Sequence, residues 1–299
     1  MSRETSAGTD KPYGLERVCR VLEFPRSTIY AREKRQTAKV VPLHPARRGP
    51  KPKVSDVDLL AAIRADLAAS PFTGEGHRKV WARLRILRDI RVSRARVLRL
   101  MRENALLSPH RRPQGLPNLH DGTITTERPN AMWGTDGIRI ETVDEGWVWV
   151  FSAVDHCDAC CVGIHAVKIG NRFAALQPIA QGLLAEFGGT FADAGRGLSL
   201  RMDNGTPYTA DDFLNQVKFW GIAPSFAFVA EPQTNGVAER FNRTLKEQAI
   251  HGRTFRNVEE VRAAVTEFKE RYNRHWRLEK LGFMSPLEAR QAYAMRKAA

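Results

Sequence analysis

The hydrophobic pattern divides the chain into an N-terminal part that predicts short helices and a C-terminal part that predicts a sheet. In 13–36 and 77–106, apolar side chains recur three or four positions apart, which is the repeat of an amphipathic helix. From residue 131 onward, segments rich in Val, Ile and Trp predict strands. The chain therefore combines helical units with a larger domain of another class.

The segment 13–36 predicts two helices separated by Pro25, and the second, basic helix starts near Ser27. The segment 77–106 predicts a second pair. Its first helix, 77–88, has the apolar residues Val80, Trp81, Leu84 and Leu87, and its second has Val97, Leu100 and Met101. Ser93 can cap that second helix.

Two short helices joined by a turn, with arginines on the exposed face, match a helix-turn-helix unit whose second helix enters a major groove. Arg91, Arg94 and Arg96 lie at the start of that helix, and we predict that they contact DNA. The alternative is a three-helix packing unit with a solvated, charged face.

The segments MWGTDGIRIETV and WVWVFSAVDH flank Asp-Glu-Gly and predict a β-hairpin. CCVGIHAV, LSLRM and APSFAF predict three further strands, and four segments with helical spacing lie among or after them. Strands first, then strands alternating with helices, indicate an α/β domain with a mixed sheet covered by helices.

The charge is uneven along the chain. The net charge is +14, and residues 1–130 hold 27 Lys and Arg against 13 Asp and Glu, whereas residues 131–299 hold 20 of each. Concentrated basic residues attract a polyanion, so nucleic acid is the expected partner, although a solubilising or membrane-surface patch has the same charge. No apolar run approaches the roughly 20 residues that cross a bilayer, and we expect a cytoplasmic, nucleoid-associated protein without a membrane partner. The four cysteines form no disulfide framework.

Three acidic residues stand where a structural role is awkward. Asp136 lies in the middle of a predicted strand, on the same side as Ile138 and Ile140. Asp203 closes a strand before an Asn-Gly turn, and Glu239 lies in a helix that also carries Arg243 and Lys246. An ionised carboxylate on a buried face is costly unless it is paired or binds a metal.

Carboxylates from separate elements that converge on one sheet edge favour Mg²⁺, which prefers oxygen ligands; Mn²⁺ is an alternative. Two such ions, about 4 Å apart, can activate a water or a 3′-hydroxyl for phosphoryl displacement. Arg243 and Lys246 would then hold the DNA backbone near the ions. Taken singly, each acid is better explained as a turn former, a cap or a solvated charge.

The strings WGTDGI, RMDNGTPY and PQTNGVAERFNRTLKEQ resemble the three catalytic blocks of DDE transposases and retroviral-type integrases. Thirty-five residues separate Asp203 from Glu239, the spacing typical of that superfamily. GHRKVWARLR, IRVSRARVLRLMRENALL and YNRHWRLEKLGFMSPLEA resemble the OrfB transposase subunit of bacterial insertion sequences. The resemblance covers residues 75–299 well and 13–36 loosely.

This resemblance implies a ribonuclease-H-like catalytic core in which Asp136, Asp203 and Glu239 are the metal ligands and Lys246 touches the DNA end. It also implies transposon ends and target DNA as substrates, a homo-oligomer on DNA, and a possible protein partner from an upstream reading frame. The expected domains are an N-terminal helical unit (1–39), a linker (40–55), a helix-turn-helix unit (56–112), a linker (113–128), the core (129–275) and a C-terminal tail (276–299).

Two other candidate metal sites remain. Cys157 and Cys160 form a lone CxxC without a second ligand pair, so buried thiols are favoured over zinc. Asp155, at the end of a predicted strand, could compete as a metal ligand. Two other function classes also remain: a DNA-binding protein without catalysis, and a ribonuclease-H-like nuclease.

Overall fold

The computed structural model describes residues 4–37, 53–108, 126–226 and 235–298. The chain forms two compact units, Met1–Lys53 and Val54–Ala299. The predicted linkers 40–55 and 113–128 lie mainly outside the described residues. Within the part that is described, no helix is long and apolar enough to cross a membrane.

The first unit contains α1 (Leu15–Val21) and α2 (Arg26–Thr37), the helical pair that was predicted around Pro25. Cys19 is buried, whereas Val21, Leu22 and Tyr30 are exposed. So short a helical pair covers little apolar surface, which is why these side chains stay in contact with solvent.

The second unit begins with three helices, α3 (Asp56–Ala69), α4 (His77–Arg88) and α5 (Arg94–Glu103). Their shared core consists of Leu59, Ile63, Val80, Leu84, Val97, Leu100 and Met101. The hydroxyl of Ser93 accepts a hydrogen bond from the Arg96 backbone N–H, which confirms the predicted cap. Leu87 was expected in the apolar stripe but is exposed. Asp89 turns the chain in the left-handed conformation, and Ile90 packs against the core instead.

A five-stranded mixed sheet follows. The strands are β1 (Met132–Thr142), β2 (Gly146–Asp155), β3 (Cys161–Val167), β4 (Ser199–Met202) and β5 (Ala223–Phe226), in the order β3-β2-β1-β4-β5. The first three are antiparallel neighbours, and β4 and β5 continue the sheet in parallel with β1. This topology confirms the predicted ribonuclease-H-like α/β core.

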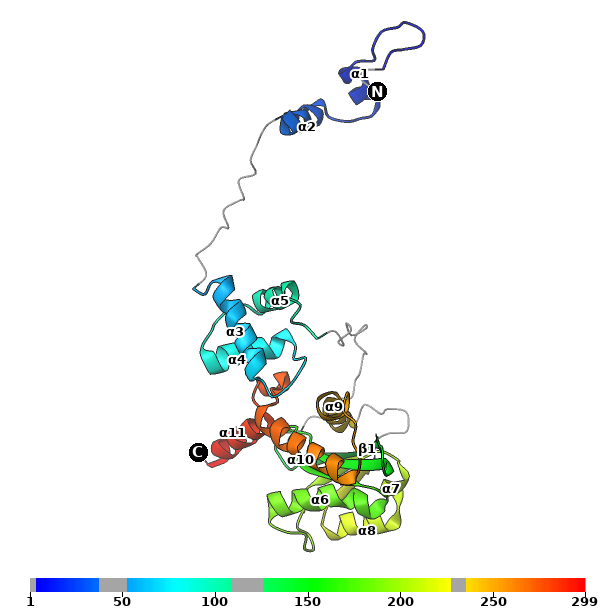
Figure 1. The fold of residues 1–299 in the computed structure, drawn as a ribbon, viewed down its shortest axis with the longest axis vertical. Helices are drawn as coiled ribbons and strands as arrows, with labels where there is room; N and C mark the ends of the chain where they lie inside the picture. Colours follow the sequence, from blue (N-terminus) through cyan, green and yellow to red (C-terminus); the bar gives the residue numbers. More distant parts are fainter. Residues whose placement is uncertain (1–3, 38–52, 109–125, 227–234, 299) are drawn as a thin grey trace. The chain divides into compact units, whose positions relative to one another are not determined.

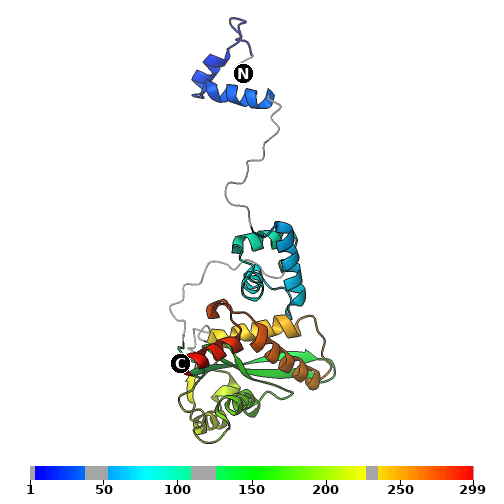
Figure 2. The same cartoon turned by 90° about the vertical axis from the view of Figure 1, so that its left-hand side faces the viewer.

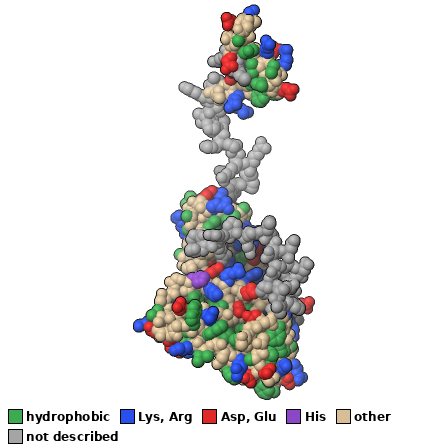
Figure 3. Space-filling model, turned by 90° about the vertical axis from the view of Figure 1, so that its right-hand side faces the viewer, with side chains coloured by type: hydrophobic (Ala, Val, Ile, Leu, Met, Phe, Trp, Pro, Cys, Tyr) green, Lys and Arg blue, Asp and Glu red, His purple; other side chains and the backbone are tan. Residues whose placement is uncertain are grey.

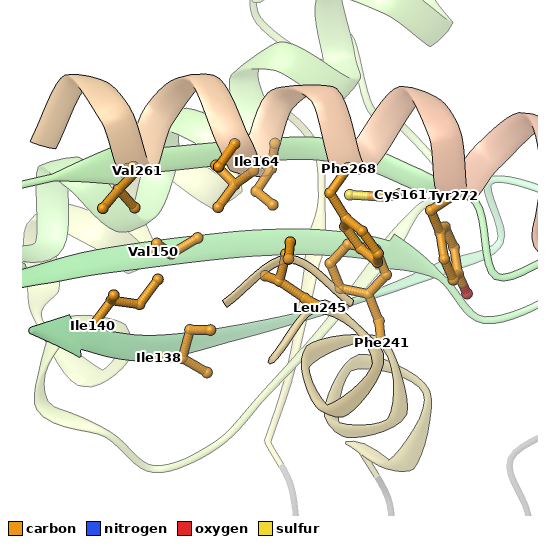
Figure 4. Close-up of a cluster of buried hydrophobic side chains, with 14 of the residues drawn as sticks. Ile138, Ile140, Val150, Cys161, Ile164, Phe241, Leu245, Val261, Phe268 and Tyr272 are labelled. Atoms are coloured by element: carbon orange, nitrogen blue, oxygen red, sulfur yellow. The ribbon is translucent and has the colours of Figure 1, made fainter. Parts of the chain in front are cut away.

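Helices cover both faces of the sheet (Figures 1 and 2). On one face lie α9 (Gly236–Leu245), a π-helical turn η2 (Lys246–Ile250) and α10 (Val258–His275). Figure 4 shows Phe241, Leu245 and Phe268 from these helices meeting Ile138 and Val150 of the strands. On the other face lie α6 (Arg172–Phe187), α7 (Thr206–Thr209) and α8 (Asp211–Phe219).

The segment predicted as a C-terminal tail contains a 3₁₀ turn η3 (Glu279–Leu281) and a further helix, α11 (Pro286–Ala298). A capping box begins α11: the Ser285 hydroxyl accepts from the Glu288 N–H at 3.3 Å, and the Glu288 carboxylate accepts from the Ser285 N–H at 2.9 Å. Arg290 of α11 forms ion pairs with Asp155 and Asp158, which attach this helix to the end of β2.

Candidate active site

A pocket of about 340 Å³ opens beside β1 and α9. Its lining residues are Asp136, Ile138, Glu239, Asn242, Arg243, Lys246, Glu247 and His251. Strand alternation turns Asp136 and Ile138 to the same face, the one that α9 covers. Glu239, Asn242, Arg243 and Lys246 stand at positions i, i+3, i+4 and i+7, which share one face of a helix. All four therefore line the pocket.

Asp136 is the most constrained acid of the pocket. Its carboxylate accepts hydrogen bonds from the Asn242 side-chain amide at 2.8 Å and from the Gly137 backbone N–H at 2.7 Å. Burial raises the pKa of Asp136, and the Asp203 carboxylate raises it further, whereas the Asn242 donor and Lys246 lower it. Ser152 on β2 donates to the Asn242 carbonyl oxygen at 3.1 Å, so the amide is held in a fixed orientation.

Asp203 comes directly after β4, which runs parallel to β1. The register pairs Gly134 with Arg201, so Asp136 and Asp203 each lie two residues farther along adjacent strands. Asp203 is exposed, and its carboxylate accepts from the Gly205 N–H at 3.0 Å. Asp203 does not line the pocket, so a meeting of the three acids stays a prediction.

Glu239 is exposed in the first turn of α9. Burial raises the pKa of Glu239, the Asp136 carboxylate raises it further, and Arg243 lowers it. Asp136 thus interacts electrostatically with both other acids. Among the described residues, however, no group of three His, Cys, Asp or Glu side chains is close enough as placed to hold one ion.

The donor chemistry of this pocket nevertheless fits Mg²⁺. Its carboxylates are oxygen ligands, the type a hard cation prefers, and the pKa values of Asp136 and Glu239 are raised mainly by burial and further by a neighbouring negative charge. Glu239 is exposed on a helix and has a long, rotatable side chain. A cation between the acids would relieve the repulsion that raises the pKa values of Asp136 and Glu239.

The two basic residues predicted beside Glu239 both line the pocket. The π-helical turn begins at Lys246, where the His251 N–H donates to the Lys246 carbonyl oxygen at 2.8 Å. Such turns shift the face that a helix presents. Here the turn keeps Glu247 and His251 at the pocket as well, although the sequence pattern did not single out either residue.

The three arginines predicted to contact DNA from the helix-turn-helix unit have different surroundings, and none lines the pocket. Arg91 is exposed and pairs with Asp89 at 2.9 Å, and Arg94 pairs with Glu279 at 3.3 Å. Arg96 is held inside the unit, where its guanidinium donates to the Asp56 carboxylate and to the Val54 carbonyl oxygen, each at 2.7 Å. Arg91 and Arg94 are therefore freer than Arg96 to meet a ligand.

Asp155, the competing acid, is fully buried and lies outside the pocket. It pairs with Arg290 at 3.0 Å and accepts from the backbone N–H groups of Asn130 and Cys157. These contacts use its carboxylate to join β2 to α11. The cysteines of the nearby CxxC are free thiols, and Cys160 is buried.

Asn242 is a site residue that sequence reasoning missed. The detectable signal was its position, since it follows Glu239 by three residues and so lies on the same helix face. Its pairing with Asp136 joins residues 106 positions apart and depends on how α9 lies across β1.

Two segments of the chain match known family models. An Integrase core domain model matches residues 220–286, and an HTH-like domain model matches residues 58–114. Transposase InsD for insertion element IS2A/D/F/H/I/K of Escherichia coli is 28% identical over 240 residues, covering 78% of each chain. InsD for insertion element IS2-9 of Escherichia coli strain K12 is also 28% identical, over 78% of this chain and 76% of its own.

Two solved structures are similar to part of the chain. The HTLV-2 integrase catalytic core domain in complex with magnesium aligns with 55% of this chain and 98% of its own, at 13% identity and a TM-score of 0.41. The catalytic core domain of BIV integrase aligns with 57% of this chain and 99% of its own, at 22% identity and a TM-score of 0.40.

Proposed function

We propose that this chain, which is 28% identical to the IS2 InsD transposases and matches an Integrase core domain model at residues 220–286, is a transposase that cuts the ends of an insertion element and joins them to target DNA. Asp136, Asp203 and Glu239 are its catalytic acids. The observation that carries the proposal is the pocket beside β1 and α9, where the half-buried Asp136 lies with Glu239, Arg243 and Lys246. Asp203, which follows the neighbouring strand β4 and does not line the pocket, interacts electrostatically with Asp136.

Both steps break a P–O3′ bond of a phosphodiester: cleavage hydrolyses it to a 3′-hydroxyl and a 5′-phosphate, and joining replaces it with a new phosphodiester bond. In cleavage, water attacks the phosphorus at the element's end and the P–O3′ bond breaks, leaving a 3′-hydroxyl. In joining, that hydroxyl attacks a target phosphodiester and a target 3′-hydroxyl leaves. Mg²⁺ or Mn²⁺ held by the three acids, as one ion or two, would supply the Lewis acid that such displacements need.

The chain's own residues bind and orient the DNA strand. Lys246 and Arg243 at the pocket would pair with phosphate oxygens, and Arg243 can do so with two parallel hydrogen bonds. Asn242 holds the Asp136 carboxylate in one orientation. In this proposal the three acids bind the cations, and Lys246 and Arg243 bind the DNA backbone.

Recognition of the ends is assigned to the helix-turn-helix unit, where Arg91 and Arg94 extend from the start of α5 and its preceding turn. Arg96 remains a DNA-contact prediction, but it would first have to leave Asp56. Because two ends must be held together, the active species would be a homo-oligomer on DNA at the bacterial nucleoid. A partner from an upstream reading frame stays an expectation from the family.

A cleavage assay tests the proposal. Labelled duplexes that carry the terminal sequence of the element should be nicked in Mg²⁺ or Mn²⁺ and not in EDTA, and a target plasmid should receive the liberated ends. Cutting of RNA–DNA hybrids in preference to these duplexes would indicate a nuclease instead. Tight, sequence-specific binding without any metal-dependent cleavage would indicate a DNA-binding protein.

A further inference from the structure

The loop between α3 and α4, residues 70–76, connects the helix-turn-helix unit to the catalytic core. Phe72 in this loop is only 4% exposed and belongs to the same buried cluster as Ile138 and Phe241 of the core. Its ring meets Trp276, after α10, edge to face at a centroid distance of 4.8 Å. Loops ordinarily run over the surface, so an aromatic ring buried in a neighbouring core marks a docking point.

A second contact fixes the backbone of the same loop. The Gln248 side chain accepts a hydrogen bond from the Thr73 N–H at 3.0 Å and donates one to the Thr73 carbonyl oxygen at 2.9 Å. One side chain thus satisfies both polar backbone groups of Thr73. Gln248 lies in the π-helical turn two residues after Lys246, so the turn that presents Lys246 to the pocket also holds the loop.

The loop is equally fixed at its helix-turn-helix end. Arg83 of α4 is buried and pairs with Asp66 of α3 at 2.8 Å and with Glu75 of the loop at 2.6 Å. The Ser70 hydroxyl donates to the same Glu75 carboxylate at 2.6 Å. Removing one partner of a buried pair leaves an uncompensated charge, so this end of the loop resists rearrangement.

Contacts on a second line run beside the loop. Glu279 of η3 pairs with Arg78 at 2.7 Å and with Arg94 at 3.3 Å, at the starts of α4 and α5. The Trp81 ring of α4 lies 5.8 Å from the ring of Phe283. Glu279 and Phe283 therefore contact the helix-turn-helix unit at α4 and α5, apart from the loop.

We propose that residues 70–76 form a fixed strut that sets the distance and rotation between helix α5 and the active-site pocket, with Gln248 as its positioning residue. The proposal rests on the proposed function, because the strut matters only if α5 binds the DNA whose end enters the pocket. The bound position of α5 then determines which phosphodiester reaches Asp136.

The geometry of DNA gives this proposal a test. Each inserted base pair moves the following phosphates by about 3.4 Å and rotates them by about 35°. Two base pairs between the site bound by α5 and the cleavage position therefore displace the scissile bond by about 7 Å and about 70°. A fixed strut cannot follow such a displacement, whereas a freely hinged unit can.

The experiment compares the full-length wild type, Gln248→Ala and a control, Gln177→Ala, which changes an exposed residue of α6. Each protein is tested on two terminal duplexes. One duplex has the native spacing, and the other has two base pairs inserted between the site bound by α5 and the cleavage position. The wild type and Gln177→Ala should cleave the duplex with native spacing at least about tenfold faster than the other duplex. For Gln248→Ala this ratio of cleavage rates should be no more than about threefold, with unchanged affinity for the duplex. An unchanged preference in Gln248→Ala, or no preference in the wild type, overturns the strut.

Hydrogen exchange at the Thr73 amide supplies a readout that needs no catalysis. Gln248 should protect this amide in the wild type, and exchange in Gln248→Ala should be at least about tenfold faster. Equal exchange rates overturn the strut even if cleavage is normal. Absence of cleavage by every protein on every substrate overturns the proposed function and the spacing role with it, whereas cleavage without spacing preference overturns the strut alone.

Discussion

Asn242→Ala should weaken metal binding at the pocket. The substitution removes the amide that donates to the Asp136 carboxylate at 2.8 Å. A hydrogen bond to a charged group contributes about 1.5–3 kcal/mol, and residues that orient metal ligands contribute about 10–100-fold to metal affinity. These two ranges agree, since a factor of ten corresponds to about 1.4 kcal/mol. We expect the Mg²⁺ dissociation constant to rise by about 10–100-fold.

The assay is calorimetric titration of the chain with Mg²⁺, and with Mn²⁺ where the affinity for Mg²⁺ is too low. Asn242 is buried, so Asn242→Ala also leaves the Ser152 hydroxyl without its partner, at a cost of about 1–3 kcal/mol in unfolding free energy. Urea unfolding in EDTA measures that cost separately. Asn215→Ala, which changes an exposed residue of α8, is the matched control. A variant at Asn242 that binds metal as tightly as this control would refute the role given to Asn242.

Three further outcomes are expected. Replacing each catalytic acid singly by its amide should abolish metal-dependent cleavage and preserve binding to end DNA; loss of binding in all three variants would instead indicate misfolding. In filter binding, Arg94→Ala should lose about 1–3 kcal/mol more on the cognate end than on a scrambled duplex, whereas Lys246→Ala should lose cleavage with a small, sequence-independent loss of affinity. Burial, Lys280 and Arg201 lower the pKa of His156 to about 4, so the stability it contributes is complete above pH 6.5 and is lost as the pH falls toward 4. Between pH 6.5 and pH 4 the free energy of urea unfolding should fall by about 3 kcal/mol more in the wild type than in His156→Gln. If both proteins lost the same free energy of unfolding over this pH range, the lowered pKa of His156 would be contradicted.

The elements that follow one strict repeat could be predicted from the sequence. Helix α10 (Val258–His275) is one of the segments with helical spacing that the sequence predicts among or after the strands. The hairpin of β1 and β2 was also predicted, because Asp-Glu-Gly interrupts two strongly apolar runs. In both cases neighbouring residues contain the whole signal, so no knowledge of distant contacts is needed.

The features that were missed depend on contacts between distant parts of the chain. Phe72 was not expected in a core, because its burial requires α10 and the sheet to be in place. The helix α11 was predicted as a tail, although Ser285 and Glu288 form a capping box that the sequence displays. Arg96 has the sequence position of a base-reading residue, yet Asp56, 40 residues earlier, holds its guanidinium. The spacing of nearby residues does not show whether an arginine binds DNA or pairs with an acid elsewhere in the chain.

The acids of the pocket work against folding, and their neighbours explain how the fold tolerates them. Burial and mutual repulsion raise the pKa of Asp136, which means that its charged form is less stable here than in water. The fold offsets this with donors that come from one helix: the Asn242 amide, Lys246 and, beside Glu239, Arg243. Asp155 in the same sheet also has a raised pKa, of about 6, because burial and the Asp158 carboxylate outweigh Arg290 and the two backbone N–H donors. Its carboxylate is nevertheless occupied, since it forms a salt bridge with Arg290 at 3.0 Å. The two aspartates therefore differ in what faces them and not in the direction of their pKa shifts: Asp155 is joined to an arginine inside the fold, whereas Asp136 lines a pocket together with Arg243 and Lys246. This difference in surroundings is why we propose the cation and the phosphate backbone at Asp136 and not at Asp155.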